Sequence, residues 1–572
     1  MMRNVRKAEA AFEAELAIVR PELSAGYAAA LPGARAAVLG RLWRSLLYEP
    51  LPGLAQPGEP AGLVGGPAGL VGGPAGVTDG PAGVTDGPAG LAEPDGRQDG
   101  QVCVALVDGR RLRGRARLPY DLDGEPALWL DGRPYTHPAE LLAALALPGT
   151  TRLVHDLDNS VASLALSRAA ATARALSPSG IDGLNTPEDY EQSVVDGHPY
   201  HPGCRNRPGV SVAEQLAYMP EHRTTVALDL VALPAAACLV TGPWPAALMD
   251  GDRLLLPLHP WQTRHVLPAL GLRPYATGAI PARPLTSVRT LAPVDGGPHV
   301  KTAFSTRMTS SVRDISPGSV RDCVPLSRLL AALSGRLGGR LAVAGYLAGA
   351  AARVGGEHSA DLSAMLREPT PRAGAETVSP VAAITREMVR DPVTWLAAFA
   401  RLALEDTLGL LALGVALEAH GQNLLVALGR DVLPYRLIYR DLADVRISPA
   451  RLARNGIETP PVSPRLLTDD LDVLHGKLLG SLVGTTFGSL VALLGRRDRA
   501  TEATLWDVVA AAARKAFDEL PGTPDAHADR DAVFGTHITV KAHLLAQLDD
   551  APPGDRWTRL PNPLAGARQR TS

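Results

Sequence analysis

The chain of 572 residues is long enough for three or four structural units, at about 100–200 residues per domain. A hydrophobic fraction of 46% and a charged fraction of 20% allow a large core, which excludes a chain that is disordered throughout. The 57 basic and 59 acidic residues give a formal net charge of -2, which argues against nucleic-acid binding chiefly through phosphates. Lysine is scarce, so a retained lysine is more informative than usual; the five are Lys7, Lys301, Lys477, Lys515 and Lys541.

The cysteines and the apolar runs indicate a soluble, cytoplasmic protein that does not associate with membranes. The four cysteines are widely spaced and form no CxxC pair, which fits a reducing cytosol and predicts neither a disulfide framework nor a zinc ribbon. The N-terminus mixes acids and bases and lacks the apolar centre of a signal peptide. No apolar run is expected to approach the ~18 residues that a membrane-spanning helix needs.

The N-terminal part is predicted to join helices to a small group of strands. Residues 1–48 carry apolar side chains at roughly helical spacing. Four heptads follow from Ala61, and because each contains Gly and Pro we interpret them as an expanded surface loop without chemistry. Strands are predicted at 101–107 and 127–130, and helices at 140–147 and 153–175.

The remaining chain is predicted to pass from a sheet to a mostly helical C-terminal third. Apolar runs alternate with Pro and Gly turns over 224–256, and 285–291 is predicted to pair with 299–304 as two strands. From residue 381 onward long apolar faces favour helices, with one short hairpin between them. The predicted helices are 393–417, 469–494 and 504–517, and the hairpin strands are 423–426 and 435–439.

The first polar cluster is the segment 197–209, which we name the histidine loop. Its sequence GHPYHPGCRNRPG is rich in Gly and Pro, which fix an extended loop geometry. His198 and His201 are three apart and could ligate a metal, but a loop broken by prolines need not bring them together. The histidines and arginines offer donors to an anion, which is the favoured interpretation. A metal site and a purely structural loop are the alternatives.

The second polar cluster is the segment 287–313, which we name the cation segment. If 287–290 is a strand, Ser287 and Arg289 share one face. Thr309 and Arg313 are four apart, which predicts one face of a helix. The acids nearest to the cations and hydroxyls of this segment are Asp295, in the turn, and Asp314, about 100° round the predicted helix from Arg313. Gathering uncompensated cations is unfavourable without a ligand. A polyanion pocket is therefore favoured over solvated charge.

The third polar cluster spans 418–441, which we name the His420 segment. A helix is predicted to end near His420, after which a strand returns and a second strand delivers Asp441. Kinase-like phosphotransferases hold Mg²⁺ with an Asn and an Asp in a similar order. Asn423 and Asp441 are therefore candidate magnesium ligands, and helix capping with turn chemistry is the alternative. The HPWQ sequence at 259–262 is expected to be a packed turn, and no Walker A, HExxH or GxSxG motif occurs.

Taken in order, these segments closely resemble the IucA/IucC family, the NRPS-independent siderophore synthetases, over roughly three quarters of the chain. Arg205 stands where the family's histidine-loop motif has lysine, which keeps the charge but not a titratable amine. The matching motifs are GHPxHPxxKxRxG at 197–209, HPWQ at 259–262, SxRT at 287–290, the lysine at 301, T[SA]xxR at 309–313, ExHxQN at 418–423 and RD at 440–441.

The resemblance implies an α+β, multidomain fold with a cupped-hand architecture. It implies a thumb-like domain at 1–150 with the heptad insertion at about 50–100, a fingers domain at 151–380 and a largely helical palm at 381–572. It also implies siderophore biosynthesis by an ATP- and Mg²⁺-dependent synthetase. Such an enzyme adenylates a carboxylic acid, commonly citrate, and joins it to an amine or hydroxyl with release of AMP and pyrophosphate.

The same resemblance implies roles for individual residues. The ATP phosphates would be bound by Ser287, Arg289, Thr290 and Lys301, with His201 also reaching the nucleotide. Arg313 would lie between phosphate and carboxylate, and Thr309, Ser310 and His420 would hold the acid. Arg313, Lys301 and His420 are the expected catalytic residues. Gln422, Asn423 and Asp441 would position nucleotide and metal.

Other interpretations stay open at this point. The acid could be a succinyl-hydroxamate monomer, as in desferrioxamine-type assembly, and the His420 segment alone is compatible with a phosphotransferase. A binding protein that does not turn over its ligand is a more distant alternative. The expected partners are small molecules, and a homodimer is what the resemblance suggests.

Overall fold

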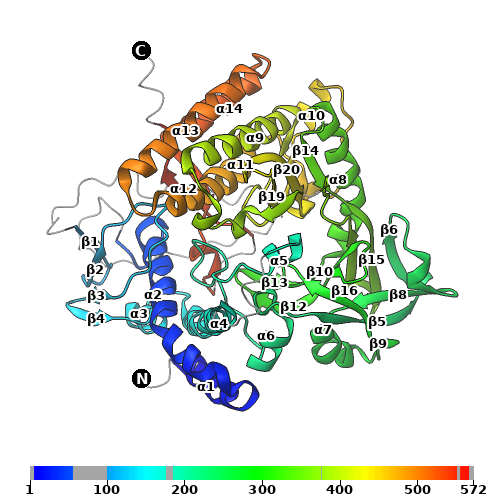
Figure 1. The fold of residues 1–572 in the computed structure, drawn as a ribbon, viewed down its shortest axis with the longest axis horizontal. Coiled ribbons are helices and arrows are strands. Elements are labelled where there is room, and N and C mark those ends of the chain that lie inside the picture. Colours follow the sequence, from blue (N-terminus) through cyan, green and yellow to red (C-terminus); the bar gives the residue numbers. More distant parts are fainter. Residues whose placement is uncertain (1–5, 56–99, 176–183, 375, 550–553, 566–572) are drawn as a thin grey trace, which may run out of the picture.

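The computed structural model describes residues 6–55, 100–175, 184–374, 376–549 and 554–565. The four heptads lie outside the described residues. Helices and sheets are mixed in several layers (Figure 1), which confirms the predicted α+β, multidomain fold class.

The N-terminal part packs long helices against a small antiparallel sheet. Helices α2 and α4 lie side by side, and their apolar faces share one core that includes Leu39, Leu42, Leu157 and Leu164. The predicted helices and strands are present with small shifts of their ends, and the four strands pair in the order β1-β2-β3-β4. The elements are α1 (Lys7–Val19), α2 (Ser24–Tyr48), β1 (Gln101–Ala105), β2 (Arg111–Arg115), β3 (Leu128–Leu130), β4 (Arg133–Tyr135), α3 (Pro138–Leu145) and α4 (Thr151–Ala175).

A nine-stranded sheet forms the middle of the molecule, in the order β6-β15-β16-β11-β10-β9-β5-β8-β7. Its paired strands are antiparallel, and α8 packs on β15. The helices are α5 (Pro187–Glu191), α6 (Val212–Tyr218), α7 (Pro260–His265) and α8 (Pro317–Arg336). The strands of the sheet are β5 (Val226–Pro234), β6 (Cys238–Thr241), β7 (Met249–Asp250), β8 (Arg253–Leu258), β9 (Ala276–Pro284), β10 (Thr290–Pro293), β11 (His299–Thr302), β15 (Tyr346–Val354) and β16 (Glu357–Arg367). Strands β12 (Phe304–Met308) and β13 (Ser311–Arg313) form a separate two-stranded sheet.

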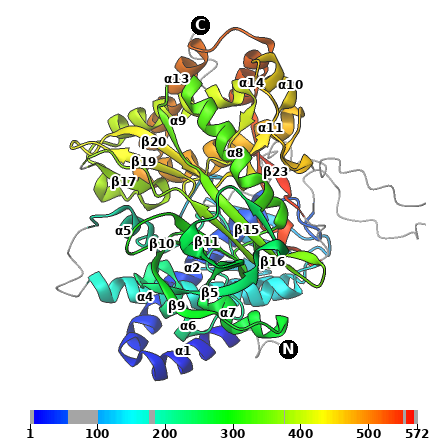
Figure 2. The same ribbon diagram turned by 90° about the vertical axis from the view of Figure 1, so that its right-hand side faces the viewer.

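The C-terminal third surrounds a four-stranded sheet, β14-β20-β19-β17, with helices. Figure 2 shows this part in the upper half of the view, above the nine-stranded sheet, with the N-terminal helix α1 at the bottom. The helices are α9 (Pro392–Leu413), α10 (Pro449–Arg454), α11 (Leu471–Ser481), α12 (Gly488–Gly495), α13 (Arg499–Asp518) and α14 (Pro524–Val533). The strands are β14 (Leu341–Ala344), β17 (Thr377–Pro380), β18 (Val415–Ala416), β19 (Leu424–Leu428), β20 (Pro434–Arg440), β21 (Arg446–Ile447), β22 (His537–Lys541) and β23 (Trp557–Pro561).

The helix predicted over Thr309–Arg313 is wrong, because this stretch is the tip and return strand of a β-hairpin. Strands β12 and β13 pair with Phe304 opposite Arg313 and Met308 opposite Ser311. Thr309 sits in the turn with φ of 60°, in the left-handed region that a right-handed helix does not contain. Thr309 and Arg313 therefore come together across a hairpin and not along a helix face.

Two further boundaries differ from the prediction. Ser287, Val288 and Arg289 form a turn closed by the hydrogen bond from Thr290 N–H to Ser287 O, so pairing with Lys301 begins only at Thr290. Helix α9 ends at Leu413 and not near His420. Gly414 ends it with a left-handed φ of 112°, although apolar residues continue after it.

The expectation that no apolar run approaches membrane-spanning length is also wrong, because one helical stretch among the described residues is long and apolar enough to span a membrane. The helical stretch Leu471–Gly495 has a mean hydropathy of 1.7 over its most apolar 18-residue window. That window is 78% buried inside the protein, and Leu474, Leu478 and Leu482 belong to the main apolar core. The stretch is a core helix of the C-terminal third.

Asp406 on α9 provides a stability test. Both carboxylate oxygens are buried without a hydrogen-bond partner among the described residues, and burial raises the pKa to about 6 against the opposing effect of Arg340. Since the unfolded chain loses this proton at lower pH, folding is penalised as pH rises from about 4 to 6. Asp406→Asn should therefore raise the free energy of unfolding by on the order of 2–3 kcal/mol at pH 8. Urea denaturation should show the gain shrinking below pH 6; an equal gain at pH 4 would contradict this explanation.

Candidate active site

A cavity of about 1200 Å³ lies where the three parts of the chain meet. The histidine loop, the cation segment and the His420 segment all contribute to its wall, together with α11 and the strand β22. Thr290 is the one predicted site residue outside the lining, since it is buried on β10 with 1% exposure. The predicted residues that line the cavity are His201, Ser287, Arg289, Lys301, Thr309, Ser310, Arg313, His420, Gln422, Asn423 and Asp441.

The HPWQ sequence holds the hairpin that carries Arg313. His259 caps α7, and the ring of Trp261 stacks on Phe304 with a centroid distance of 4.6 Å. Gln262 accepts the Ser305 N–H at 2.9 Å and donates to the Ser305 hydroxyl at 2.8 Å. The segment is therefore packed as expected, but it is the capped first turn of helix α7 and not a loop turn, and it supports β12 through Phe304 and Ser305.

Lys301 and Asp441 meet in the cavity wall, which joins the cation segment to the His420 segment. Lys301 Nζ lies 2.6 Å from Asp441 Oδ1 and 3.1 Å from the Tyr346 hydroxyl. Burial lowers the pKa of Lys301 to about 8, against the opposing effect of Asp441. Burial alone would raise the pKa of Asp441, but Lys301 and Arg289 hold it well below its usual range. The acid that pairs with Lys301 is thus supplied from 140 residues away in the sequence.

Arg289 and Arg313, two of the three arginines of the cation segment, are not neutralised in this way. Arg289 donates to the carbonyl of Asp314, and Arg313 Nη2 donates to the carbonyl of Met308 at 2.9 Å. Within the described chain neither makes an ion pair with a carboxylate. Burial, with Arg289 next, lowers the pKa of Arg313 to about 10, so Arg313 stays protonated at neutral pH. Two half-buried cations that repel each other favour an anion between them.

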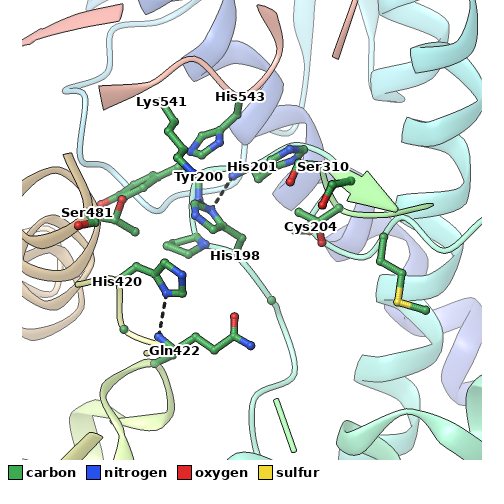
Figure 3. A pocket seen from close by; sticks show the side chains of 18 of the residues that line it. His198, Tyr200, His201, Cys204, Ser310, His420, Gln422, Ser481, Lys541 and His543 are labelled. Carbon is green, nitrogen blue, oxygen red and sulfur yellow. Dashed lines mark hydrogen bonds between the residues drawn. The ribbon is translucent and has the colours of Figure 1, made fainter. Parts of the chain in front are cut away.

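The His420 segment begins with a tight turn, residues 418–423, at the cavity wall. His420 Nδ1 accepts the Gln422 N–H at 3.3 Å (Figure 3), and the His420 carbonyl accepts the Asn423 N–H at 2.9 Å. Asn423 Nδ2 donates to the Glu418 carbonyl at 3.3 Å. Asp441, in the left-handed region with φ of 66°, ends β20 and turns its side chain to Lys301.

Two lysines that the sequence analysis did not assign also line the cavity. Lys541 Nζ lies 2.7 Å and Lys477 Nζ 3.3 Å from the same oxygen of Glu418. Burial alone would raise the pKa of Glu418, but the two lysines hold it well below its usual range. Three of the five lysines of the chain, with Lys301, therefore meet at one cavity. The scarcity of lysine is the signal that points to them.

The histidine loop meets a third histidine that the sequence analysis missed. The ring of His543 lies 4.7 Å from that of His198 and 5.1 Å from that of His201, measured between centroids (Figure 3). Arg205 is turned away from this group, because its guanidinium donates to the carbonyls of Val194 at 2.5 Å and Val195 at 2.8 Å. Arg205 therefore fixes the loop from behind.

Lys301→Ala should raise the Michaelis constant for ATP and lower kcat, if the cavity binds the triphosphate as predicted. Losing one charge-assisted hydrogen bond costs about 1.5–3 kcal/mol, which is on the order of tenfold to a hundredfold. Steady-state kinetics at varied ATP measure this. Lys515→Ala is the matched control, since Lys515 is 63% exposed and outside the cavity. Unchanged ATP kinetics in folded Lys301→Ala would show that the phosphates bind elsewhere.

The curated relatives include two synthases of Staphylococcus aureus. Staphyloferrin A synthase is 23% identical over 433 residues, covering 66% of this chain and 72% of that protein. L-2,3-diaminopropanoate–citrate ligase is 25% identical over 473 residues, covering 72% of this chain and 79% of that protein.

Solved structures share the fold over most of the chain. The petrobactin biosynthesis protein AsbB of Bacillus anthracis superposes with a TM-score of 0.72 and 16% identity, covering 96% of this chain and 98% of that one. ATP-bound aerobactin synthetase IucA of Klebsiella pneumoniae gives 0.66 and 21%, covering 82% and 97%.

Two family models match successive parts of the chain. Residues 393–554, which hold the helical C-terminal third, match the ferric iron reductase FhuF-like transporter model. Residues 186–386, which hold the histidine loop, the HPWQ sequence and the cation segment, match the model of the IucA / IucC family. The order of motifs, the fold and this match agree, and the chain belongs to the IucA/IucC family.

Proposed function

We propose that this protein is a siderophore synthetase that adenylates a carboxylic acid, citrate first among candidates, and joins it to an amine or hydroxyl. The observation that carries the proposal is the cavity in which Arg289 and Arg313 stand without acidic partners beside the Lys301–Asp441 pair. Relatives named as a staphyloferrin A synthase and a citrate ligase support citrate, and the ATP-bound structural neighbour supports ATP.

The chemistry explains why such a cavity is needed. A carboxylate does not react usefully with an amine in water, because its leaving group would be oxide. Transfer to the α-phosphate of ATP makes AMP the leaving group and releases pyrophosphate. Bringing a citrate trianion against a triphosphate opposes two polyanions, and fixed cations offset that repulsion. Little covalent work is then left for side chains.

The proposed roles follow the cavity wall. Ser287, Arg289 and Lys301 bind phosphates, while Thr290 supports them from β10 without reaching the cavity. Arg313 bridges phosphate and carboxylate, because its fork of donors can contact two anions. The acid is held by Thr309, Ser310 and His420, and the nucleotide by Gln422 with His201.

The residues present fit a magnesium ion carried by ATP. Lys301 and Tyr346 contact only Oδ1 of Asp441, which leaves Oδ2 for a cation. Asn423 lines the same cavity, and because its Nδ2 donates to the Glu418 carbonyl, its amide oxygen remains as a second candidate ligand. Among the described residues no group of three His, Cys, Asp or Glu could hold a metal by itself. This suits Mg²⁺, which takes few protein ligands and keeps phosphates and water. When bound, it would neutralise phosphate charge.

Several coarser proposals accompany this one. The domain boundaries near 150 and 380 and a homodimer are carried over from the family resemblance, and a cytoplasmic location from the widely spaced cysteines and the composition of the N-terminus. Size-exclusion chromatography with light scattering tests the last of these.

A product assay tests the proposed function. The purified protein is given ATP, Mg²⁺ and hydroxylamine with each acid of a panel that includes citrate and a succinyl-hydroxamate. We expect citrate to give the highest rate of pyrophosphate and AMP release. A higher rate with the succinyl-hydroxamate would reassign the acid, ADP release would indicate a phosphotransferase, and no nucleotide product with any acid would contradict the synthetase assignment.

A further inference from the structure

Two imidazoles of the histidine loop are held by backbone N–H groups in the same way. His198 Nδ1 accepts hydrogen bonds from the N–H of Tyr200 and of His201, each at 3.2 Å. His201 Nδ1 accepts one from the N–H of Gly203 at 2.9 Å. A ring nitrogen that accepts a hydrogen bond carries no proton, so the proton of each neutral ring lies on Nε2.

The surroundings keep both rings neutral. Protonation at Nδ1 would place a ring N–H against a backbone N–H, which is unfavourable. The charged neighbours are cations, which also disfavour a positively charged ring. Burial, then His201 and His420, lowers the pKa of His198 well below its usual range. Burial, then Arg313 and Arg41, lowers the pKa of His201 to about 3. The titratable and charged groups that face the pair are Arg41, Arg44, Arg313, His420 and His543.

The Nε2 atom of His201 has no hydrogen-bond partner among the described residues, although it is buried and the residue is only 3% exposed. The residue lines the cavity and lies next to the Thr309 turn. A Cβ atom placed on Gly203 would be 3.2 Å from the His201 ring and 3.3 Å from the Thr309 carbonyl. Figure 3 shows His201 near Ser310 at one side of the cavity. A buried, unpaired donor at this place is unfavourable until a ligand accepts its hydrogen bond.

We propose that His198 and His201 act as neutral hydrogen-bond donors, through Nε2–H, to an anionic oxygen bound in the cavity. They neither take the proton of the attacking nucleophile nor ligate a metal. A base would need a free lone pair on Nε2, and a metal at Nε2 would move the proton to Nδ1, where the backbone N–H already stands. The identity of the anion rests on the proposed function: a phosphate of ATP and a carboxylate of the acid share this chemistry.

The first test needs no substrate. The full-length protein with ¹⁵N-labelled histidine is studied by two-bond ¹H–¹⁵N correlation, with His198→Gln and His201→Gln used to assign the signals. We expect an unprotonated Nδ1 and a protonated Nε2 in both rings, with no titration between about pH 6 and 8, where an ordinary histidine changes charge. A proton on Nδ1, or a ring that titrates in this range, would overturn the proposal.

Adding ATP alone and citrate alone then distinguishes the two sources of the anion. The Nε2–H signal of a ring should move downfield with the ligand that it binds, and no movement with either ligand would overturn the proposal. His259 is an internal control, because its Nδ1 accepts the Trp261 N–H at 3.1 Å and its Nε2 is also buried without a partner. His259 does not line the cavity, so its signals should stay in place.

Activity assays complete the test with two variants of His201. Glutamine keeps an N–H donor and leucine removes it. We expect His201→Leu to raise the Michaelis constant of the anion identified by the shift about tenfold, the effect of one hydrogen bond, and His201→Gln to raise it less. The pH profiles should keep the wild-type shape between about pH 6 and 8. A profile limb that disappears in His201→Leu would show a base and overturn the proposal. The predicted tautomers in a protein that releases no pyrophosphate would support this inference and contradict the proposed function.

Discussion

Glu191→Gln should lower the free energy of unfolding by about 3–5 kcal/mol and raise the Michaelis constant for ATP, although Glu191 does not line the cavity. Glu191 is 1% exposed and forms an ion pair with Arg440, which is itself buried. Its Oε2 also accepts from the N–H and hydroxyl of Thr286, at 3.0 and 2.6 Å. Removing the charge leaves Arg440 buried without compensation.

The kinetic part of this prediction follows from what the two partners hold. Arg440 donates to the Gln422 carbonyl at 2.9 and 3.1 Å and precedes Asp441, while Thr286 precedes Ser287. A single carboxylate therefore ties the turn of the cation segment to the His420 segment across the cavity wall. Loosening it should displace both proposed nucleotide-binding turns together.

Asp529→Asn is the control that separates the effect of Glu191 on the nucleotide-binding turns from a general loss of folding stability. Asp529 makes a comparably buried ion pair with Arg451, with both oxygens at 2.8 Å from the guanidinium, and neither residue lines the cavity. We expect both variants to lose stability in urea denaturation. Only Glu191→Gln should raise the Michaelis constant for ATP, measured at a temperature where both are folded. Equal ATP kinetics in the two variants would show that Glu191 is purely structural.

Much of the fold could be predicted from local patterns. Long periodic helices such as α4 and α13 appear where apolar spacing places them, because their stability comes from one continuous buried face. The end of α9 was misplaced since apolar residues continue past Gly414, into β18 and a buried turn. Burial alone does not distinguish helix from strand there, and the left-handed backbone at Gly414 decides it.

The Thr309–Arg313 stretch shows where local reasoning fails. Four polar residues and Val312 can follow either helical or strand spacing, and the choice is made by pairing with Phe304, which Trp261 fixes from another element. The motif resemblance nevertheless placed both residues at the cavity. Lys541 and His543 were missed for a related reason: they reach the cavity on β22 and the residues after it, and no motif marks them. The roles of the lining residues stay predictions.

Arg313→Lys should reduce the rate of adenylation about a thousandfold while preserving much of the ATP binding. Charge stabilisation by an arginine in phosphoryl-type transfer can reach ~10³-fold, and lysine cannot contact phosphate and carboxylate at once through a planar fork. The variant should also lose charge. Burial lowers the pKa of Arg313 to about 10, and in the same cavity wall it lowers the pKa of the more deeply buried Lys301 to about 8. A lysine at this position would lose its proton as the pH rises through that region.

The rate deficit of Arg313→Lys should therefore grow as the pH rises from about 7 to 9, whereas a purely geometric defect would be constant. Pyrophosphate release at saturating citrate and ATP measures it, and separate titrations of the two substrates locate the loss. Arg353→Lys is the matched control, since Arg353 is exposed on β15 and outside the cavity. If Arg313→Lys weakens only ATP binding and leaves the response to citrate unchanged, Arg313 contacts phosphate alone. The carboxylate must then be held by the other side of the cavity, where Lys477 and Lys541 flank Glu418.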